Sequence, residues 1–168
     1  CSPAVADILR TTPAWRALLD QGNLLLQEFC SDEPVECGGF TVTPLEVPHR
    51  DDLSDMHALL VDAERKLLFL PDHDSWDATL AAVGATDPRD WFRQLDIDIV
   101  LLDGTFWSSN ELPRQVEVPH PPVRETMELI GTRREGDSRI VFVHLNHTNP
   151  LCNPDSAESL ELASTGWE

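Results

Sequence analysis

The sequence is short of basic residues. Twelve lysines and arginines stand against thirty aspartates and glutamates, which gives a formal charge of −18 at pH 7. Nucleic-acid binding depends on neutralising phosphates with lysine and arginine, so this balance argues against a nucleic-acid partner. It argues equally against an anionic membrane surface. A solvated acidic surface is the simplest explanation of the charge, although clustered acids and imidazoles can also hold cations.

The sequence also lacks membrane-spanning and disulfide signals. No apolar run approaches the ~20 residues of a membrane span, and Cys1 to Leu9 has no basic start that would indicate a signal peptide. Because there is no initiator methionine, we expect the chain to begin inside a longer protein. The four cysteines form no CxxC pair, so we expect free thiols in a reducing, cytoplasmic compartment. A zinc knuckle at Cys30 and Cys37 lacks a second close pair.

The length and composition predict one globular domain over residues 1–168, with 41% hydrophobic and 25% charged residues. Alternating periodicities predict an α/β fold. The expected strands are Leu24–Phe29, Phe40–Val47, Met56–Val61, Lys66–Leu70, Ile97–Leu102 and Ile140–Val143. The expected helices run from Pro3 to Gly22 with a break at Pro13, and over Trp76–Val83, Arg89–Leu95, Pro121–Ile130 and Ala157–Ala163. Ile97–Leu102 is almost purely apolar, which predicts burial on both faces.

The stretch that organises the chain is RIVFVHLNHTNP, residues 139–150. An apolar strand there ends directly on His144, and His147 follows three residues later. Three earlier strands end in the same way, in PHR, PDHD and DGT. Because functional groups of α/β proteins collect where strands end, we expect these segments to converge on one site.

The residues at these strand ends favour a transition metal. His49, Asp72 and His144 supply two imidazoles and a carboxylate, which suit zinc, iron or manganese better than calcium. A metal held there could lower the pKa of a bound water towards ~7.

Each residue also has a structural interpretation. His49 could lie on a surface loop, Asp72 could cap a turn, and Asp103 could bind backbone amides around Gly104. His57, inside a strand pattern, is better explained as structural. His73 could simply be a neighbour of Asp72, and His120 could be an ordinary residue at the start of a helix. His147 could cap its loop.

Six segments resemble the metallo-β-lactamase-fold hydrolases, and in particular their PqqB-like branch. They are SPAVADILRTTPAW, FTVTPLEVPHR, LFLPDHDSW, LLDGTFW, HPPVRETM and VFVHLNHTNP, in this order. Together they span nearly the whole chain. The DGTFW and HxNxTNP signatures are fairly specific to the branch, whereas the single His and Asp positions are shared by the wider superfamily.

The resemblance implies a four-layer αββα sandwich with a two-metal site, zinc being expected first and iron or manganese as alternatives. It implies that His49 and His144 are metal ligands and that Asp72 is the bridging aspartate. Asp103 and His120 resemble the acid and histidine that assist proton transfer in the phosphodiesterase relatives.

The resemblance also implies that His147 and Asn149 line the rim of the site, where they would contact a substrate. It places them beside the ligands on the segment that follows the last apolar strand.

One family feature is missing. No HxHxDH motif occurs, and this motif supplies the other ligands. We therefore expect an incomplete metallo-β-lactamase-like sandwich, the second half of the fold, from a protein cut at both ends. A partner chain carrying the first half, a homodimer, or a metal-free member of the family are the alternatives.

The function implied for the intact protein is hydrolysis of a small-molecule ester, amide or phosphodiester by metal-activated water. An iron-dependent oxidative or hydroxylating step in cofactor biosynthesis, as in PqqB-type members, is one alternative. A non-catalytic small-molecule binding or assembly module is the other.

Overall fold

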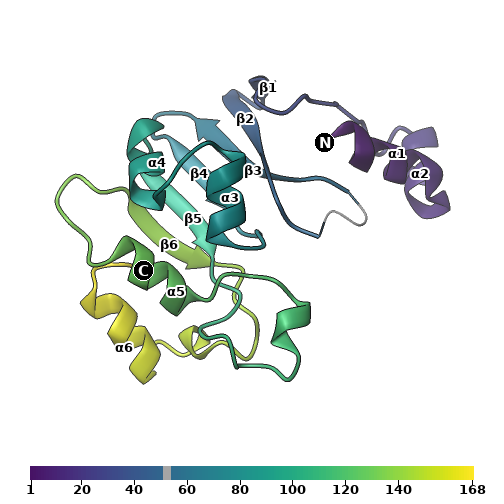
Figure 1. Ribbon diagram of the computed structural model, residues 1–168. Helices are drawn as coiled ribbons and strands as arrows, with labels where there is room; N and C mark the ends of the chain where they lie inside the picture. The colour runs from purple at the N-terminus through teal and green to yellow at the C-terminus, as the bar shows by residue number, and fades with distance from the viewer. Residues whose placement is uncertain (51–53) are drawn as a thin grey trace.

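The computed structural model describes residues 1–50 and 54–168 as a mixed six-stranded sheet with helices, in the strand order β1-β2-β3-β4-β5-β6 (Figure 1). The strands are β1 Val35–Cys37, β2 Phe40–Val47, β3 Met56–Asp62, β4 Leu67–Leu70, β5 Ile99–Asp103 and β6 Arg139–Val143. The helices are α1 Pro3–Thr11, α2 Pro13–Asp20, α3 Trp76–Ala82, α4 Pro88–Gln94, α5 Val123–Ile130 and α6 Ala157–Ser164. Two 3₁₀ turns, η1 Gln115–Glu117 and η2 Pro150–Cys152, lie in the loops.

Four of the strands point in one direction. β2 and β4 both pair with β3 in antiparallel fashion, so they share a direction, and β4, β5 and β6 pair in parallel. The carboxyl ends of β2, β4, β5 and β6 therefore lie at the same end of the sheet. The segments that follow these four strands are the ones in which the sequence places histidines and aspartates.

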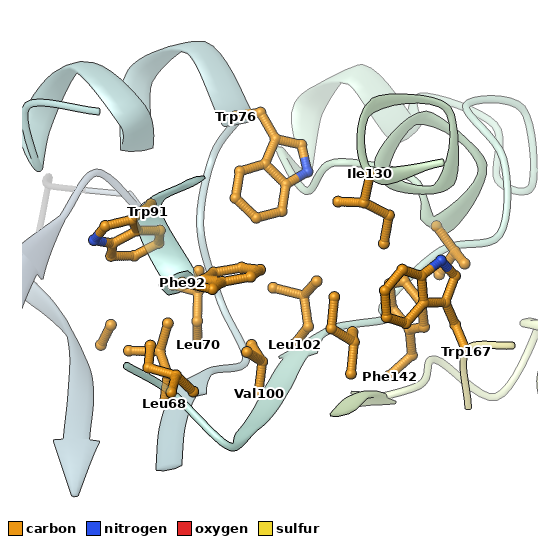
Figure 2. Packing of buried hydrophobic residues seen from close by; sticks show 14 of the residues in the cluster. Leu68, Leu70, Trp76, Trp91, Phe92, Val100, Leu102, Ile130, Phe142 and Trp167 are labelled. Carbon is orange, nitrogen blue, oxygen red and sulfur yellow. The ribbon is translucent and has the colours of Figure 1, made fainter. Parts of the chain in front are cut away.

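One face of the sheet packs under α3, α4 and α5 (Figures 1 and 2). Side chains that alternate along the strands point into this layer, which fits the two-residue period of a strand. Trp76, Trp91 and Phe92 from the helices pack against them. The strand residues of this core are Val47, Ala58, Leu68, Leu70, Val100, Leu102, Ile140 and Phe142.

The opposite face of the sheet is apolar and only partly covered. Leu59, Phe69, Leu101 and Val141 lie in register across β3 to β6. Phe69 is 37% exposed, and Leu101 and Val141 are half-buried. The expectation that residues 97–102 are buried on both faces was therefore wrong, because Ile99 and Leu101 belong to this second face.

The first N-terminal helix, α1, forms as its capping signals predict. Ser2 caps α1, its hydroxyl accepting a hydrogen bond from Val5 N, and Pro3 occupies the first turn. α1 and α2 lie to one side of the sheet, beyond β2 and β3 (Figure 1). Residues 24–29, expected as a strand, belong to no strand of the sheet, so that prediction was wrong.

The cysteines and the helices agree with two sequence expectations. Cys1, Cys30, Cys37 and Cys152 are free thiols. Within residues 1–50 and 54–168, no helix is long and apolar enough to cross a bilayer.

A buried charge cluster fastens α4 to the loop before β6. The Asp137 side chain is 5% exposed; it pairs with Arg89, which is 8% exposed, and with Arg93 Nη2 at 3.1 Å. Arg89 also donates to Ile130 O at 2.5 Å. Burial acts to raise the pKa of Asp137, but the backbone N–H of Arg134 and the charges of Arg89 and Arg93 outweigh it and lower that pKa.

We expect Asp137→Asn to lower the free energy of unfolding by about 3 kcal/mol, because it leaves the buried Arg89 without its carboxylate. Asp137 has a lowered folded-state pKa, so its contribution is present above the unfolded value of ~3.9 and is lost as the pH falls through the folded value. Urea unfolding across a pH series measures both effects. Asp90→Asn, which removes an exposed partner of Arg93, is the control and should change stability by no more than ~1 kcal/mol. Equal effects of the two substitutions would contradict this assignment.

Candidate metal centre at the strand ends

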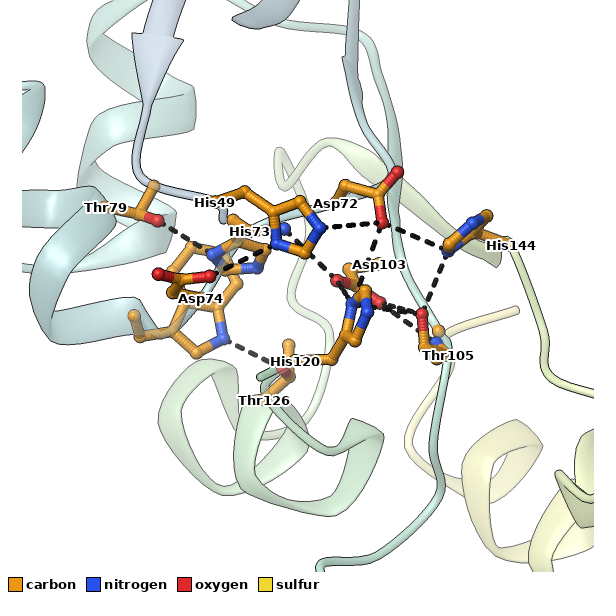
Figure 3. Close-up of polar contacts among 12 residues, drawn as sticks. His49, Asp72, His73, Asp74, Thr79, Asp103, Thr105, His120, Thr126 and His144 are labelled. Carbon is orange, nitrogen blue, oxygen red and sulfur yellow. Dashed lines mark hydrogen bonds and ion pairs between the residues drawn. The ribbon is translucent and has the colours of Figure 1, made fainter. Parts of the chain in front are cut away.

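The turns after β2 and β4 are fastened together. Asp74 N donates to Pro48 O at 2.9 Å, so the residues following the two strands lie side by side. His49 is 9% exposed, and its Nδ1 lies 3.2 Å from Asp74 Oδ1. Its Nε2 faces Asp72 Oδ1 at 3.7 Å. The backbone contact thus presents His49 and Asp72 to each other (Figure 3).

The ends of β5 and β6 are joined by backbone contacts around Gly104. Gly104 N donates to Val143 O at 2.9 Å, and Asn146 N donates to Thr105 O at 3.0 Å. A Cβ atom on Gly104 would lie 2.8 Å from Val143 O. The segment that follows β5 and the end of β6 therefore approach so closely that only a glycine fits at this position. His144 follows directly, with a left-handed φ of 60° that turns the chain out of the strand.

His120 reaches the same place from the start of α5. Val123 N donates to Phe106 O at 2.8 Å, which holds this helix start against the segment after β5. The His120 side chain is 6% exposed and packs edge-on against Phe106. Its Nδ1 lies 2.7 Å from Asp103 Oδ2, within hydrogen-bond distance.

The structure therefore brings His49, Asp72, Asp103, His120 and His144 into one cluster (Figure 3). Asp72 Oδ1 is central: it lies 3.7 Å from His49 Nε2, 3.5 Å from His144 Nδ1 and 3.8 Å from His120 Nδ1. Within the described part of the chain, two overlapping triads have the spacing of metal ligands, His49–Asp72–His120 and Asp103–His120–His144. The cluster is buried at one side and open to solvent at the other: the side chain of Asp103 is 0% exposed and that of His144 is 47% exposed.

Asp103 is a fully buried carboxylate with several donors. Thr105 donates to Oδ1 from its backbone N at 2.9 Å and from its hydroxyl at 2.8 Å. His73 N donates to Oδ2 at 3.3 Å, beside His120. Burial acts to raise the pKa of Asp103, but the hydrogen bond and charge of His120, with the N–H of Thr105, lower it overall. Asp103 is therefore an anion near neutral pH.

Two side chains at the site were not expected from the sequence to matter there. Thr105 Oγ1 lies 2.9 Å from His144 Nδ1 and 3.2 Å from His120 Nδ1, in addition to Asp103. His73 is fully buried, with Nδ1 2.8 Å from Thr79 Oγ1. Burial lowers the pKa of His73 to about 4 against the opposing charge of Asp103, so this ring is neutral. The PDHD and DGT signals contained both residues but did not show that their side chains point inward.

The two residues expected at the rim differ in exposure. His147 is exposed, and its Nδ1 lies 3.2 Å from Asn146 Oδ1. Asn149 is 2% exposed; its amide donates to Gly104 O at 2.7 Å and its Oδ1 accepts from Leu151 N. Asn149 therefore fastens the loop to the end of β5 and does not face solvent.

Comparison with known proteins gives one consistent family. A family model described as a β-lactamase superfamily domain matches residues 1–145. Coenzyme PQQ synthesis protein B of Acinetobacter baumannii (strain SDF) is 29% identical over 139 residues, covering 76% of this chain and 43% of the relative. The same protein of Xanthomonas oryzae pv. oryzae (strain MAFF 311018) is 26% identical over 181 residues, covering 99% and 60%. The chain thus spans only 43% to 60% of the length of these curated relatives.

Solved structures show the same fold. Zn²⁺-bound PqqB from Methylobacterium extorquens aligns with a TM-score of 0.73 at 18% identity, covering 99% of this chain and 60% of that one. A diphosphatase of the PhnP family aligns with a TM-score of 0.51 at 15% identity, covering 89% and 47%. At these identities the likeness shows the architecture alone.

The close approach at Gly104 yields a prediction. Gly104→Ala places a Cβ 2.8 Å from Val143 O and 3.0 Å from Phe142 Cβ, so we expect a loss of about 1–3 kcal/mol in the free energy of unfolding. Gly104→Ser, with one more atom, should lose more. Chemical denaturation measures both variants. Unfolding midpoints equal to that of the parent protein would show that the β5 and β6 ends are not packed as described.

Proposed function

The chain belongs to the β-lactamase superfamily and has the metallo-β-lactamase fold, and on this premise we propose that its His–Asp cluster holds a divalent metal for hydrolysis of a small molecule. The resemblance to the PqqB-like branch, predicted from the sequence, agrees with the curated relatives. The observation that supports the proposal most is the convergence of His49, Asp72 and His144 from three separate strand ends.

The donor set fits a metal of the zinc type. Two imidazoles and a carboxylate are nitrogen and oxygen donors, which zinc, iron and manganese accept. Donors of a tetrahedral zinc site, with bonds of ~2.0–2.1 Å, lie roughly 3.3 Å apart. His49 Nε2 and Asp72 Oδ1 are 3.7 Å apart, so a small adjustment suffices. We place zinc first, as in the Zn²⁺-bound PqqB structure, with iron and manganese as alternatives.

We assign His49, Asp72 and His144 to holding the metal, with Asp72 between the two histidines. A bound divalent metal would supply Lewis-acid activation of water and of the substrate. The resemblance to the metallo-β-lactamase-fold hydrolases implies two metals, and the remaining ligands would then come from outside the two triads of the described residues.

We assign proton transfer to His120. Its ring is held by the hydrogen bond from Nδ1 to Asp103 Oδ2 at 2.7 Å, which leaves Nε2 as the nitrogen for exchange. An anionic Asp103 stabilises the ring when it takes up a proton. His120 can then give that proton to the oxygen that leaves the substrate. His147, exposed on the rim, is our candidate for substrate contact, whereas Asn149 holds the loop.

The negative charge of the chain limits the classes of substrate that we propose. With −18 overall and with Asp72, Asp74 and Asp103 around the cluster, a polyanion such as a nucleic acid would be repelled. A small ester, amide or phosphodiester fits better. Because one structural neighbour is a diphosphatase, we include phosphoesters among the substrates to be tested.

The curated relatives favour a second candidate, a contribution to coenzyme PQQ synthesis by an oxidative or hydroxylating step. The same ligands can hold iron, which such a step requires. Elemental analysis of the protein purified without added metal separates the two. Zinc with hydrolysis of model esters supports the first, and iron without hydrolysis supports the second.

Removing a ligand tests the metal assignment. Asp72→Ala and His144→Ala should each weaken zinc binding by at least about 100-fold, more than the loss of an outer hydrogen-bond partner gives. Equilibrium dialysis with elemental analysis measures this. Asp62→Asn, an exposed carboxylate at the end of β3, is the control and should bind zinc normally. Normal zinc stoichiometry and affinity in both Ala variants would refute the assignment.

Substituting His120 separates proton transfer from metal binding, because His120 also belongs to both triads. We expect His120→Ala to lower kcat by about 10²–10⁴-fold on a model ester or phosphodiester that the protein hydrolyses. Zinc affinity should fall by no more than about 100-fold, the range for a partner outside the ligand set. If His120→Ala loses zinc as completely as Asp72→Ala, His120 is a ligand instead.

A further inference from the structure

Thr105 joins three of the groups at the site, although it is neither an acid nor an imidazole. Its side chain is buried, with the residue 7% exposed. Its single Oγ1 atom lies 2.8 Å from Asp103 Oδ1, 2.9 Å from His144 Nδ1 and 3.2 Å from His120 Nδ1 (Figure 3). A hydroxyl has one proton and two lone pairs, so these contacts restrict where the protons can be.

The contact to Asp103 fixes the hydroxyl proton. Carboxylate oxygens only accept, and Oγ1 is 2.8 Å from Oδ1, so the Thr105 hydroxyl donates to Asp103. If it donated to His144 instead, two acceptor oxygens would face each other at 2.8 Å with no proton between them. The backbone N–H of Thr105, 2.9 Å from the same Oδ1, holds the carboxylate in this orientation.

The proton on His144 follows from this. Since the Thr105 proton points to Asp103, Oγ1 can only accept from His144 Nδ1 at 2.9 Å. His144 is then protonated on Nδ1, and its lone pair is on Nε2. His120 does not compete for Oγ1, because its Nδ1 has the shorter contact of 2.7 Å to Asp103 Oδ2.

We propose that Thr105 is a positioning residue that holds His144 in the Nδ1–H tautomer. The nitrogen available to a metal is then Nε2, and not the protonated Nδ1 that lies 3.5 Å from Asp72 Oδ1. The role of Nε2 as a metal ligand rests on the proposed function. The tautomer of His144 does not, because it follows from the contacts within this chain. The hydrogen bond made by one ring nitrogen determines which nitrogen ligates, and such outer partners influence metal affinity. His144 needs this support because its side chain is 47% exposed and its own backbone is in the left-handed region, with φ 60°.

The test compares Thr105→Val, which has similar shape without the hydroxyl, with Thr105→Ser, which keeps it. Long-range ¹H–¹⁵N NMR of the ring nitrogens, recorded on the metal-free protein near pH ~8, above the ordinary histidine pKa of ~6.5, identifies the tautomers. In the parent protein and in Thr105→Ser, we expect His144 to carry its proton on Nδ1. In Thr105→Val, we expect His144 to shift towards the Nε2–H form.

His120 is the internal control, because Asp103 Oδ2 still accepts from its Nδ1 in Thr105→Val. A change at His144 with His120 unchanged supports the proposal. A parent His144 protonated on Nε2, or a His144 signal that Thr105→Val leaves unchanged, overturns it. The parent measurement alone is decisive if Thr105→Val does not fold.

Zinc affinity gives the second readout. We expect Thr105→Val to weaken binding by about 10–100-fold and Thr105→Ser to restore most of it. Weaker binding in Thr105→Val with an unchanged tautomer would indicate a packing role and would overturn the proposal. If the tautomer shifts but the parent protein binds no zinc, the inference on Thr105 stands and the metal function proposed above fails.

Discussion

The site depends on the common direction of β2, β4, β5 and β6. Because these four strands run the same way, the residues that follow each of them emerge at one end of the sheet. His49 and His144 are separated by most of the chain, yet both lie within 3.7 Å of Asp72 Oδ1. The antiparallel strand β3 makes this possible, since it returns the chain to the other end of the sheet between β2 and β4.

The buried Asp103 is the second requirement. A carboxylate that is 0% exposed is unfavourable unless donors replace the water it has lost. Three segments supply them: Thr105 just after β5, His73 after β4, and His120 before α5. The same bonds that make the anion tolerable also fix the ring of His120 and orient the hydroxyl of Thr105. The same hydrogen bonds to Asp103 therefore stabilise the site and determine where its protons lie.

The sequence predicted the parts that local chemistry determines. Ser2 and Pro3 begin α1, and the β-branched run at residues 140–143 forms β6. The expected polar groups lie within two residues of the ends of β2, β4, β5 and β6. Residues 24–29 have a strand-like composition, but they bond with the backbone of Cys1 and join no strand of the sheet, because strand pairing depends on the rest of the fold. Asn149 was expected at the rim, but it is buried because its amide bonds with Gly104 O. The role of Thr105 could not be read from the DGT motif, since it arises only when His144 arrives from a strand 39 residues later.

The electrostatics of the cluster favour the divalent cation that we propose for it. Asp72 and Asp74 flank His49, and Asp103 contacts His120, so carboxylates lie next to imidazoles that bind metals in their uncharged form. Asp72 and Asp74 are 21% and 34% exposed, and water screens part of their repulsion. A divalent cation bound there would offset the repulsion between these carboxylates that water does not screen. With Thr105 orienting His144 and Asp103 orienting His120, the two rings already differ in the acceptors of their Nδ1 protons. The buried Asp103 carboxylate beside His120 is consistent with the proton-transfer role that we propose for that ring.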